Sequence, residues 1–170
     1  SQNIVSPNIS YIPQSLKICG SEGSVVIKLD NYNEFSNPVL QWYKNDETIA
    51  DESTFPTYIA KEEGDYRLRI ENSRGCVTYS EKIEVRLDAG NLVKPELSAE
   101  NGGVIQPGPG KSTLTITNVD PTVQEYIWYN RNEIIQRGSG TTYDAVEAGT
   151  YFVQAIYDIN CASTSDTINI

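Results

Sequence analysis

Short runs in which every second residue is apolar dominate the chain. In the first half the alternating positions are Val25/Ile27/Leu29, Leu40/Trp42, Tyr66/Leu68/Ile70 and Ile83/Val85/Leu87. In the second half they are Leu114/Ile116, Tyr126/Trp128, Tyr151/Val153/Ala155 and Ile168/Ile170. A period of two places alternate side chains on one face of a strand, so each run predicts a strand with one buried face. No segment has the sustained 3.6-residue period of a helix, and the pattern therefore predicts an all-β protein.

The same pattern occurs twice. The segment around Trp42 returns around Trp128, and three further positions recur with an offset of 85 residues. These pairs are Tyr58/Tyr143, Gly64/Gly149 and Cys76/Cys161. Self-similarity of this length indicates two copies of one structural unit. The sequence predicts two tandem β-sandwich domains, residues 1–89 and 90–170. The short linker between them predicts an end-to-end arrangement with limited swing.

Charge and hydropathy exclude two classes of partner. The net charge of −10 would repel a phosphate backbone, so no nucleic acid is expected. No stretch approaches the roughly 18 consecutive apolar residues of a membrane helix, so no direct membrane insertion is expected. The chain begins at Ser1. We therefore expect a segment of a larger protein, with other domains of that protein as its partners.

Catalytic motifs are absent. The chain has no histidine and no G-x-S-x-G, which rules out Ser-His-Asp and Cys-His sites within it. Acidic pairs such as Glu62-Glu63 are expected to be solvated turn residues, and no cofactor is implied. Asp and Asn at 30–34 and 158–160 could bind Ca²⁺, but they are also the usual residues of turns. We expect a protein that is not an enzyme and has no metal site.

Three cysteines lie far apart along the chain. None forms a C-x-x-C pair, and without histidine the usual zinc sites are impossible. An isolated disulfide is the more plausible role. It would place the protein in an oxidising compartment, either secreted or on the cell surface.

A second motif follows each tryptophan at about twenty residues: E-x-G-x-Y at 62–66 and again at 147–151. This combination resembles the immunoglobulin superfamily. The resemblance implies immunoglobulin-like sandwiches in which the tryptophan packs between the sheets and the tyrosine hydroxyl bonds to upstream backbone. It thus implies that Trp42, Tyr66, Trp128 and Tyr151 are core residues.

The cysteine positions and the W-Y-K-N segment at 42–45 are similar to bacterial immunoglobulin-like repeats of large secreted and adhesin-type surface proteins. The resemblance implies a Cys19–Cys76 disulfide. Cys161 would then be an unpaired thiol or would pair with another chain or domain. It also implies a non-catalytic structural or adhesive role, as a spacer or protein-interaction repeat.

Strand parity indicates one candidate binding face. If Trp128 and Tyr151 point inward, then Ile127, Tyr129 and Phe152 point outward together on adjacent strands. An aliphatic and aromatic cluster of this kind often marks an interface. It could contact a surface protein, stack on a glycan, be covered by another domain of the parent chain, or be shielded by loops. The alternative function is therefore a carbohydrate-binding module appended to a glycan-degrading enzyme.

Overall fold

The computed structural model describes residues 5–105 and 110–170, and these form an all-β structure, as predicted. The helical segments in these ranges are two short 3-10 turns, η1 (Tyr32–Glu34) and η2 (Glu100–Gly103). The strands form four sheets, which enclose two separate cores.

The first core lies within residues 9–88, which we call the N-terminal sandwich. Its smaller sheet has the order β1-β3-β6, formed by β1 (Ile9–Ile12), β3 (Val25–Leu29) and β6 (Thr57–Ala60). Its larger sheet has the order β2-β9-β7-β4-β5, and β8 also pairs with β7. These strands are β2 (Lys17–Cys19), β4 (Val39–Lys44), β5 (Glu47–Thr48), β7 (Gly64–Glu71), β8 (Val77–Tyr79) and β9 (Ile83–Asp88). All pairs are antiparallel except β2 with β9.

The second core lies within residues 97–169, the C-terminal sandwich. One sheet has the order β10-β11-β14, formed by β10 (Leu97–Ala99), β11 (Ser112–Ile116) and β14 (Thr142–Ala145). The other has the order β13-β12-β15-β16, and β17 also pairs with β15. These strands are β12 (Glu125–Asn130), β13 (Glu133–Gly138), β15 (Thr150–Ile156), β16 (Ala162–Thr164) and β17 (Ile168–Asn169).

Equivalent aromatic residues occupy equivalent places in the two cores. Trp42 and Trp128 are fully buried, and each indole N–H donates to a backbone carbonyl of its own sandwich. Tyr66 and Tyr151 are at most 2% exposed, and each hydroxyl donates over 2.7 Å to the carbonyl four residues upstream. A large ring fills the space between two sheets while its polar atom finds a backbone partner. The matched tryptophan and tyrosine residues of the two halves are therefore buried in the same way and make the same kind of backbone hydrogen bond.

The central strands of the two sandwiches differ in how many of their residues are buried. In β7, residues alternate strictly between buried and half-buried positions, as a sheet with one solvated face requires. In β15, the five central residues are all buried, and in β12 the four central residues are. A strand buried on both sides needs a cover on each face of its sheet. The C-terminal sandwich covers only one face of this sheet with its own strands.

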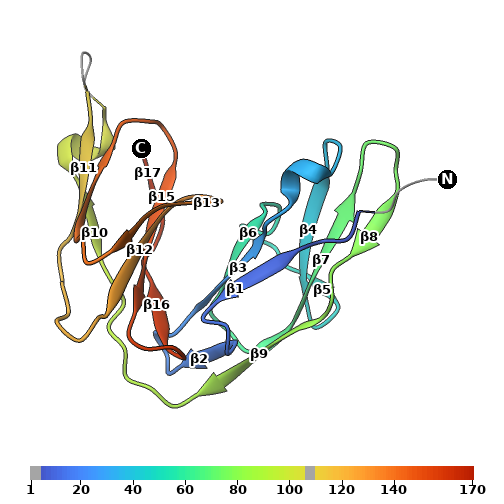
Figure 1. Cartoon of the computed structure of the whole chain (residues 1–170), viewed down its shortest axis with the longest axis horizontal. Coiled ribbons are helices and arrows are strands. Elements are labelled where there is room, and N and C mark those ends of the chain that lie inside the picture. Colours follow the sequence, from blue (N-terminus) through green and yellow to red (C-terminus); the bar gives the residue numbers. More distant parts are fainter. Residues whose placement is uncertain (1–4, 106–109) are drawn as a thin grey trace.

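The N-terminal sandwich supplies the second cover. The two sandwiches lie side by side, joined along the lower edge of the view in Figure 1, with β1, β3 and β6 turned toward the sheet of β12, β15 and β16. The expected end-to-end arrangement is therefore wrong. The linker is short, as predicted, but the chain reverses direction there, and two apolar sheet faces become buried against each other.

Candidate functional site

The candidate binding face is buried at the junction between the sandwiches. Ile127 and Tyr129 are 0% exposed and Phe152 is 3% exposed. The three form a cluster with Val26 of the N-terminal sandwich, and Ile12, Ile59, Ile134 and Ile156 pack around it. The alternation of side chains along the strands correctly predicted that these three point out of their own sandwich. The prediction that they form an exposed surface for an external ligand was wrong, because the neighbouring sheet covers them.

A buried polar contact crosses the centre of the junction. The Tyr129 hydroxyl donates to Gln154 Oε1 over 2.7 Å, and Gln154 Nε2 donates to the Ile12 carbonyl over 2.9 Å. Gln154 is fully buried, and the rings of Tyr129 and Phe152 stack with centroids 4.5 Å apart. Buried polar atoms are costly unless they are paired, so these bonds favour one register between the sandwiches.

Burial raises the pKa of the Tyr129 phenol well above its ordinary value of about 10. A phenol whose pKa is higher in the folded protein than in the unfolded chain stabilises the fold in its neutral form. This stabilisation is complete below the pKa of the unfolded chain and is lost as the pH rises toward the pKa of the folded protein. We expect the free energy of unfolding to fall steeply above about pH 10. Tyr129→Phe should reduce that slope, measured by denaturant unfolding at successive pH values. An unchanged slope would show that Tyr129 ionises as freely in the folded protein as in the unfolded chain.

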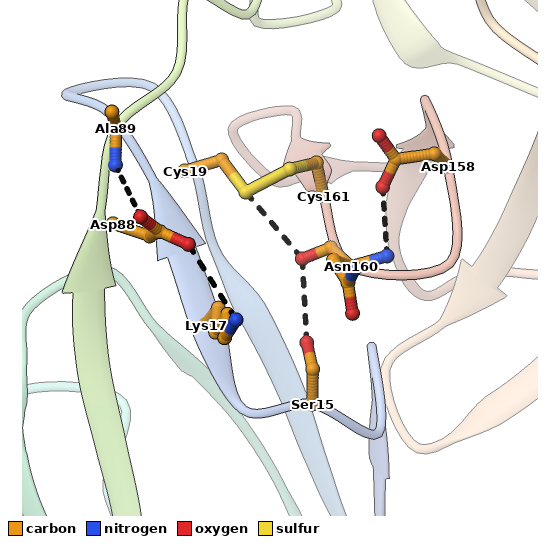
Figure 2. Close-up of a disulfide and its surroundings, with 8 residues drawn as sticks. All are labelled: Ser15, Lys17, Cys19, Asp88, Ala89, Asp158, Asn160 and Cys161. Carbon is orange, nitrogen blue, oxygen red and sulfur yellow. Dashed lines mark hydrogen bonds and ion pairs between the residues drawn. A yellow bond between two sulfur atoms is a disulfide. The ribbon is translucent and has the colours of Figure 1, made fainter.

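A disulfide joins the sandwiches near the linker. Cys19 at the end of β2 bonds to Cys161 between β15 and β16, with a Cα–Cα distance of 5.5 Å and a sequence separation of 142 residues (Figure 2). The implied Cys19–Cys76 pair is therefore wrong, and so is the expectation of an unpaired Cys161. The reason is the position of Cys76. It follows β7, whereas Cys19 lies beside Asp88, beyond the other end of β7. The eight residues of β7 alone span about 23 Å, so the two positions lie much too far apart for a disulfide.

The surroundings of the disulfide are closely packed. Asn160 accepts a hydrogen bond from Ser15 through its carbonyl, and Cys19 Sγ lies 3.4 Å from the same oxygen (Figure 2). A Cβ placed on Gly90 in the linker would lie only 2.7 Å from Cys19 Cβ, so only glycine fits there. Ser24 donates its backbone N–H to the Ala162 carbonyl over 2.9 Å. The linker, the disulfide and these bonds hold the two sandwiches together at one end of the junction.

Polar residues connect the sandwiches at the other end. Arg131 Nη1 lies 3.3 Å from Glu52 Oε2, and its guanidinium stacks 3.6 Å above the centre of the Phe55 ring. Asn132 Oδ1 accepts the Thr57 backbone N–H over 3.1 Å. Sequence reasoning missed these residues because charged and amide side chains after a strand are ordinary turn residues. The signal that could have shown the junction was the unbroken apolar run in 126–129, which is unusual for a strand with one solvated face.

A hollow of about 370 Å³ lies between the sandwiches near these polar contacts. Residues of both sandwiches line it, among them Thr57, Lys61, Arg131 and Asp166. Within the described ranges, no group of three or more His, Cys, Asp or Glu side chains could hold a metal ion. In the same part of the chain, no helix is long and apolar enough to span a membrane.

Comparisons with known proteins do not assign a family. No protein-family model and no curated protein matches the sequence. Among solved structures, the chain is similar to the fibronectin(III)-like modules of Clostridium thermocellum CbhA. The TM-score is 0.36 and the sequence identity 16%, over 96% of this chain and 93% of that chain.

Proposed function

We propose that this chain is a non-catalytic structural or adhesive module of a bacterial cell-surface or secreted protein. Two immunoglobulin-like domains, residues 1–89 and 90–170, act in it as one rigid unit. The observation that carries the proposal is the junction. An apolar cluster, a buried glutamine and a disulfide connect sheets that would otherwise be independent. Interfaces of this kind restrict the relative motion that a linker alone would permit.

The geometry favours a rigid bend over an extended spacer. Apolar side chains of both sandwiches pack together and the chain turns back at the linker, so the unit cannot straighten into a linear spacer. It can instead set the direction in which neighbouring domains of the parent protein project. The disulfide supports a secreted or surface location, because such bonds persist in oxidising compartments.

Small-angle X-ray scattering of the oxidised chain tests the rigid unit. We expect a scattering profile that matches the side-by-side arrangement and does not change with salt concentration, because the centre of the junction is apolar. The double variant Cys161→Ser, Phe152→Ala should give a larger radius of gyration, since it removes the covalent link and a central side chain. A wild-type profile that requires separated, independently moving sandwiches would refute the proposal.

The alternative is a carbohydrate-binding module, for which the aromatic face was the candidate platform. That face is buried, so the rings of Tyr129 and Phe152 cannot stack on a sugar. A binding role therefore needs a different site. Side chains of both sandwiches remain accessible in the hollow beside the polar contacts of the junction.

A further inference from the structure

The junction uses one sheet of each sandwich and leaves the outer face of the other sheet uncovered. It joins the smaller N-terminal sheet, β1-β3-β6, to the larger C-terminal sheet around β12 and β15. The larger N-terminal sheet and the smaller C-terminal sheet remain open, and Figure 1 shows their strands β8 and β11 at opposite sides of the molecule. The strand registers allow each open face to be compared with the junction face of the other sandwich.

The open face of the larger N-terminal sheet carries two arginines. In the C-terminal sandwich, the residues beside Trp128 form the cross-strand pairs Tyr129/Phe152 and Ile127/Gln154. In the N-terminal sandwich, the residues beside Trp42 form the corresponding pairs Tyr43/Arg67 and Gln41/Arg69. Arg67 therefore stands where the junction has Phe152, and Arg69 stands where it has Gln154. Arg69 pairs with Glu71 over 3.1 Å, whereas Arg67 has no ion pair with any residue of the described ranges.

Exposed apolar side chains flank these arginines. Val39 on β4 is 61% exposed, and Val77 and Tyr79 on β8 are 42% and 51% exposed. They lie on the two strands that border β7, and Tyr79 is the cross-strand neighbour of Arg69. Apolar side chains that gather on one face often mark an interaction surface. We call this surface, with Arg67 and Arg69 at its centre, the arginine face.

The open face of the smaller C-terminal sheet carries two carboxylates. In the N-terminal sandwich, the junction residues of this sheet form the row Ile12/Val26/Ile59. In the C-terminal sandwich, the corresponding row, next to the repeated tyrosine, is Glu100/Thr113/Asp144. Thr113 donates its hydroxyl to Asp144 over 2.7 Å, and its backbone nitrogen lies 3.4 Å from Glu100 Oε2. Lys111 also reaches Asp144, so one negative charge remains in excess on this surface, the acidic face.

The arginine face and the acidic face match each other as the two junction faces do. In the junction, Gln154 bonds to the Ile12 carbonyl, and Phe152 belongs to one apolar cluster with Ile59. The same arrangement applied to the open faces creates two pairs of opposite charge, Arg69/Glu100 and Arg67/Asp144. Neither pair can form within one chain, because the faces lie at opposite sides of it. Complementary charges favour association and fix its register.

We propose that copies of this chain associate head to tail, with the acidic face of one copy packed on the arginine face of the next. The contact repeats the geometry of the junction and replaces its apolar centre by two charge pairs. Each copy uses two different faces, so the association extends into a row and does not close as a symmetric dimer. The proposal goes beyond the rigid module, because it gives that module a partner, a second copy of the same chain.

Sedimentation equilibrium of the full oxidised chain tests the association. At low salt we expect the average mass to rise above 18.9 kDa with a Kd of about 0.1–1 mM, as suits a small polar contact. The rise should shrink in about 0.5 M salt, which screens exposed charges. A mass that stays at the single-chain value up to about 1 mM protein would overturn the proposal. Scattering from dilute protein reports on single chains, so the test of the rigid unit is independent of this result.

Charge reversals on each face identify the contact. Arg67→Glu and Asp144→Arg should each raise the Kd at least about tenfold, because each places like charges opposite one another. Asp144→Arg makes the chain less negative, so a general relief of charge repulsion would predict stronger association instead. Arg74→Glu is the matched control, since Arg74 is exposed in the turn beyond β7 and also lacks an ion pair in the described ranges. It should associate as the wild type does. Equal loss in Arg67→Glu and Arg74→Glu would contradict the assignment.

Mixing the two reversed variants tests the head-to-tail arrangement. The Arg67→Glu chain keeps its acidic face, and the Asp144→Arg chain keeps its arginine face. An equimolar mixture should therefore associate with a Kd near that of the wild type, although neither variant does so alone. The restored association would also show that both variants are folded. A mixture that associates no better than the separate variants would refute the pairing of these two faces.

Discussion

Replacing Cys161 by serine should lower the free energy of unfolding by about 4–5 kcal/mol, the largest single effect that we expect in this chain. The bond closes a loop of 142 residues, and in the chain-entropy account a longer loop restricts the unfolded chain more. Denaturant unfolding followed by tryptophan fluorescence measures the change, because Trp42 and Trp128 report on separate cores.

Cys76→Ser is the matched control for this result. Cys76 is exposed in the turn after β7 and lies outside the disulfide, so its replacement should change stability by less than about 0.5 kcal/mol. Wild-type protein under reducing conditions should behave like Cys161→Ser. If Cys76→Ser were the destabilising variant and Cys161→Ser were neutral, the pairing between the sandwiches would be incorrect.

Phe152→Ala should cost about 3–5 kcal/mol, the range for removing a large aromatic side chain from a core. Phe152 is 3% exposed, although its side chain points out of its own sandwich. The loss would open a cavity against Tyr129 and Val26, at the centre of the junction. Denaturant unfolding measures the energy, and scattering shows whether the sandwiches separate.

Tyr79→Ala is the control that distinguishes the loss of a junction contact from the loss of any aromatic side chain. Tyr79 is 51% exposed on β8 of the N-terminal sandwich, and its truncation should change stability by less than about 0.5 kcal/mol. Similar costs for Phe152→Ala and Tyr79→Ala would mean that Phe152 is solvent-exposed in solution and that the junction does not form.

Most of the secondary structure was predictable because it depends on local patterns. The alternation in 64–71 became β7 with its inward face of Tyr66, Leu68 and Ile70. The repeated tryptophan and tyrosine positions became equivalent core positions. These outcomes follow from the two-residue period of a strand and from the size of an aromatic ring, both of which are properties of neighbouring residues.

The candidate site was only half predictable. The two-residue period of the strands correctly predicted that Ile127, Tyr129 and Phe152 lie on one outer face. Their burial, however, depends on Val26 and Ile59, which are more than sixty residues away in the sequence. The hollow was not predictable, because Lys61 and Asp166 meet only when the chain has reversed at the linker. Residues on opposite sides of such a junction have no regular spacing in the sequence.

The cysteines show most clearly which features the sequence determined and which only the tertiary structure decided. Their number, and the absence of histidine, determined by themselves that a disulfide was the plausible cysteine chemistry. The alternation of apolar residues likewise determined an all-β structure. Only the tertiary structure decided that Cys19 bonds to Cys161, because a disulfide requires Cα atoms about 5–6 Å apart. That distance is set by how two sheets pack, which depends on the shape and burial of whole faces and not on local sequence.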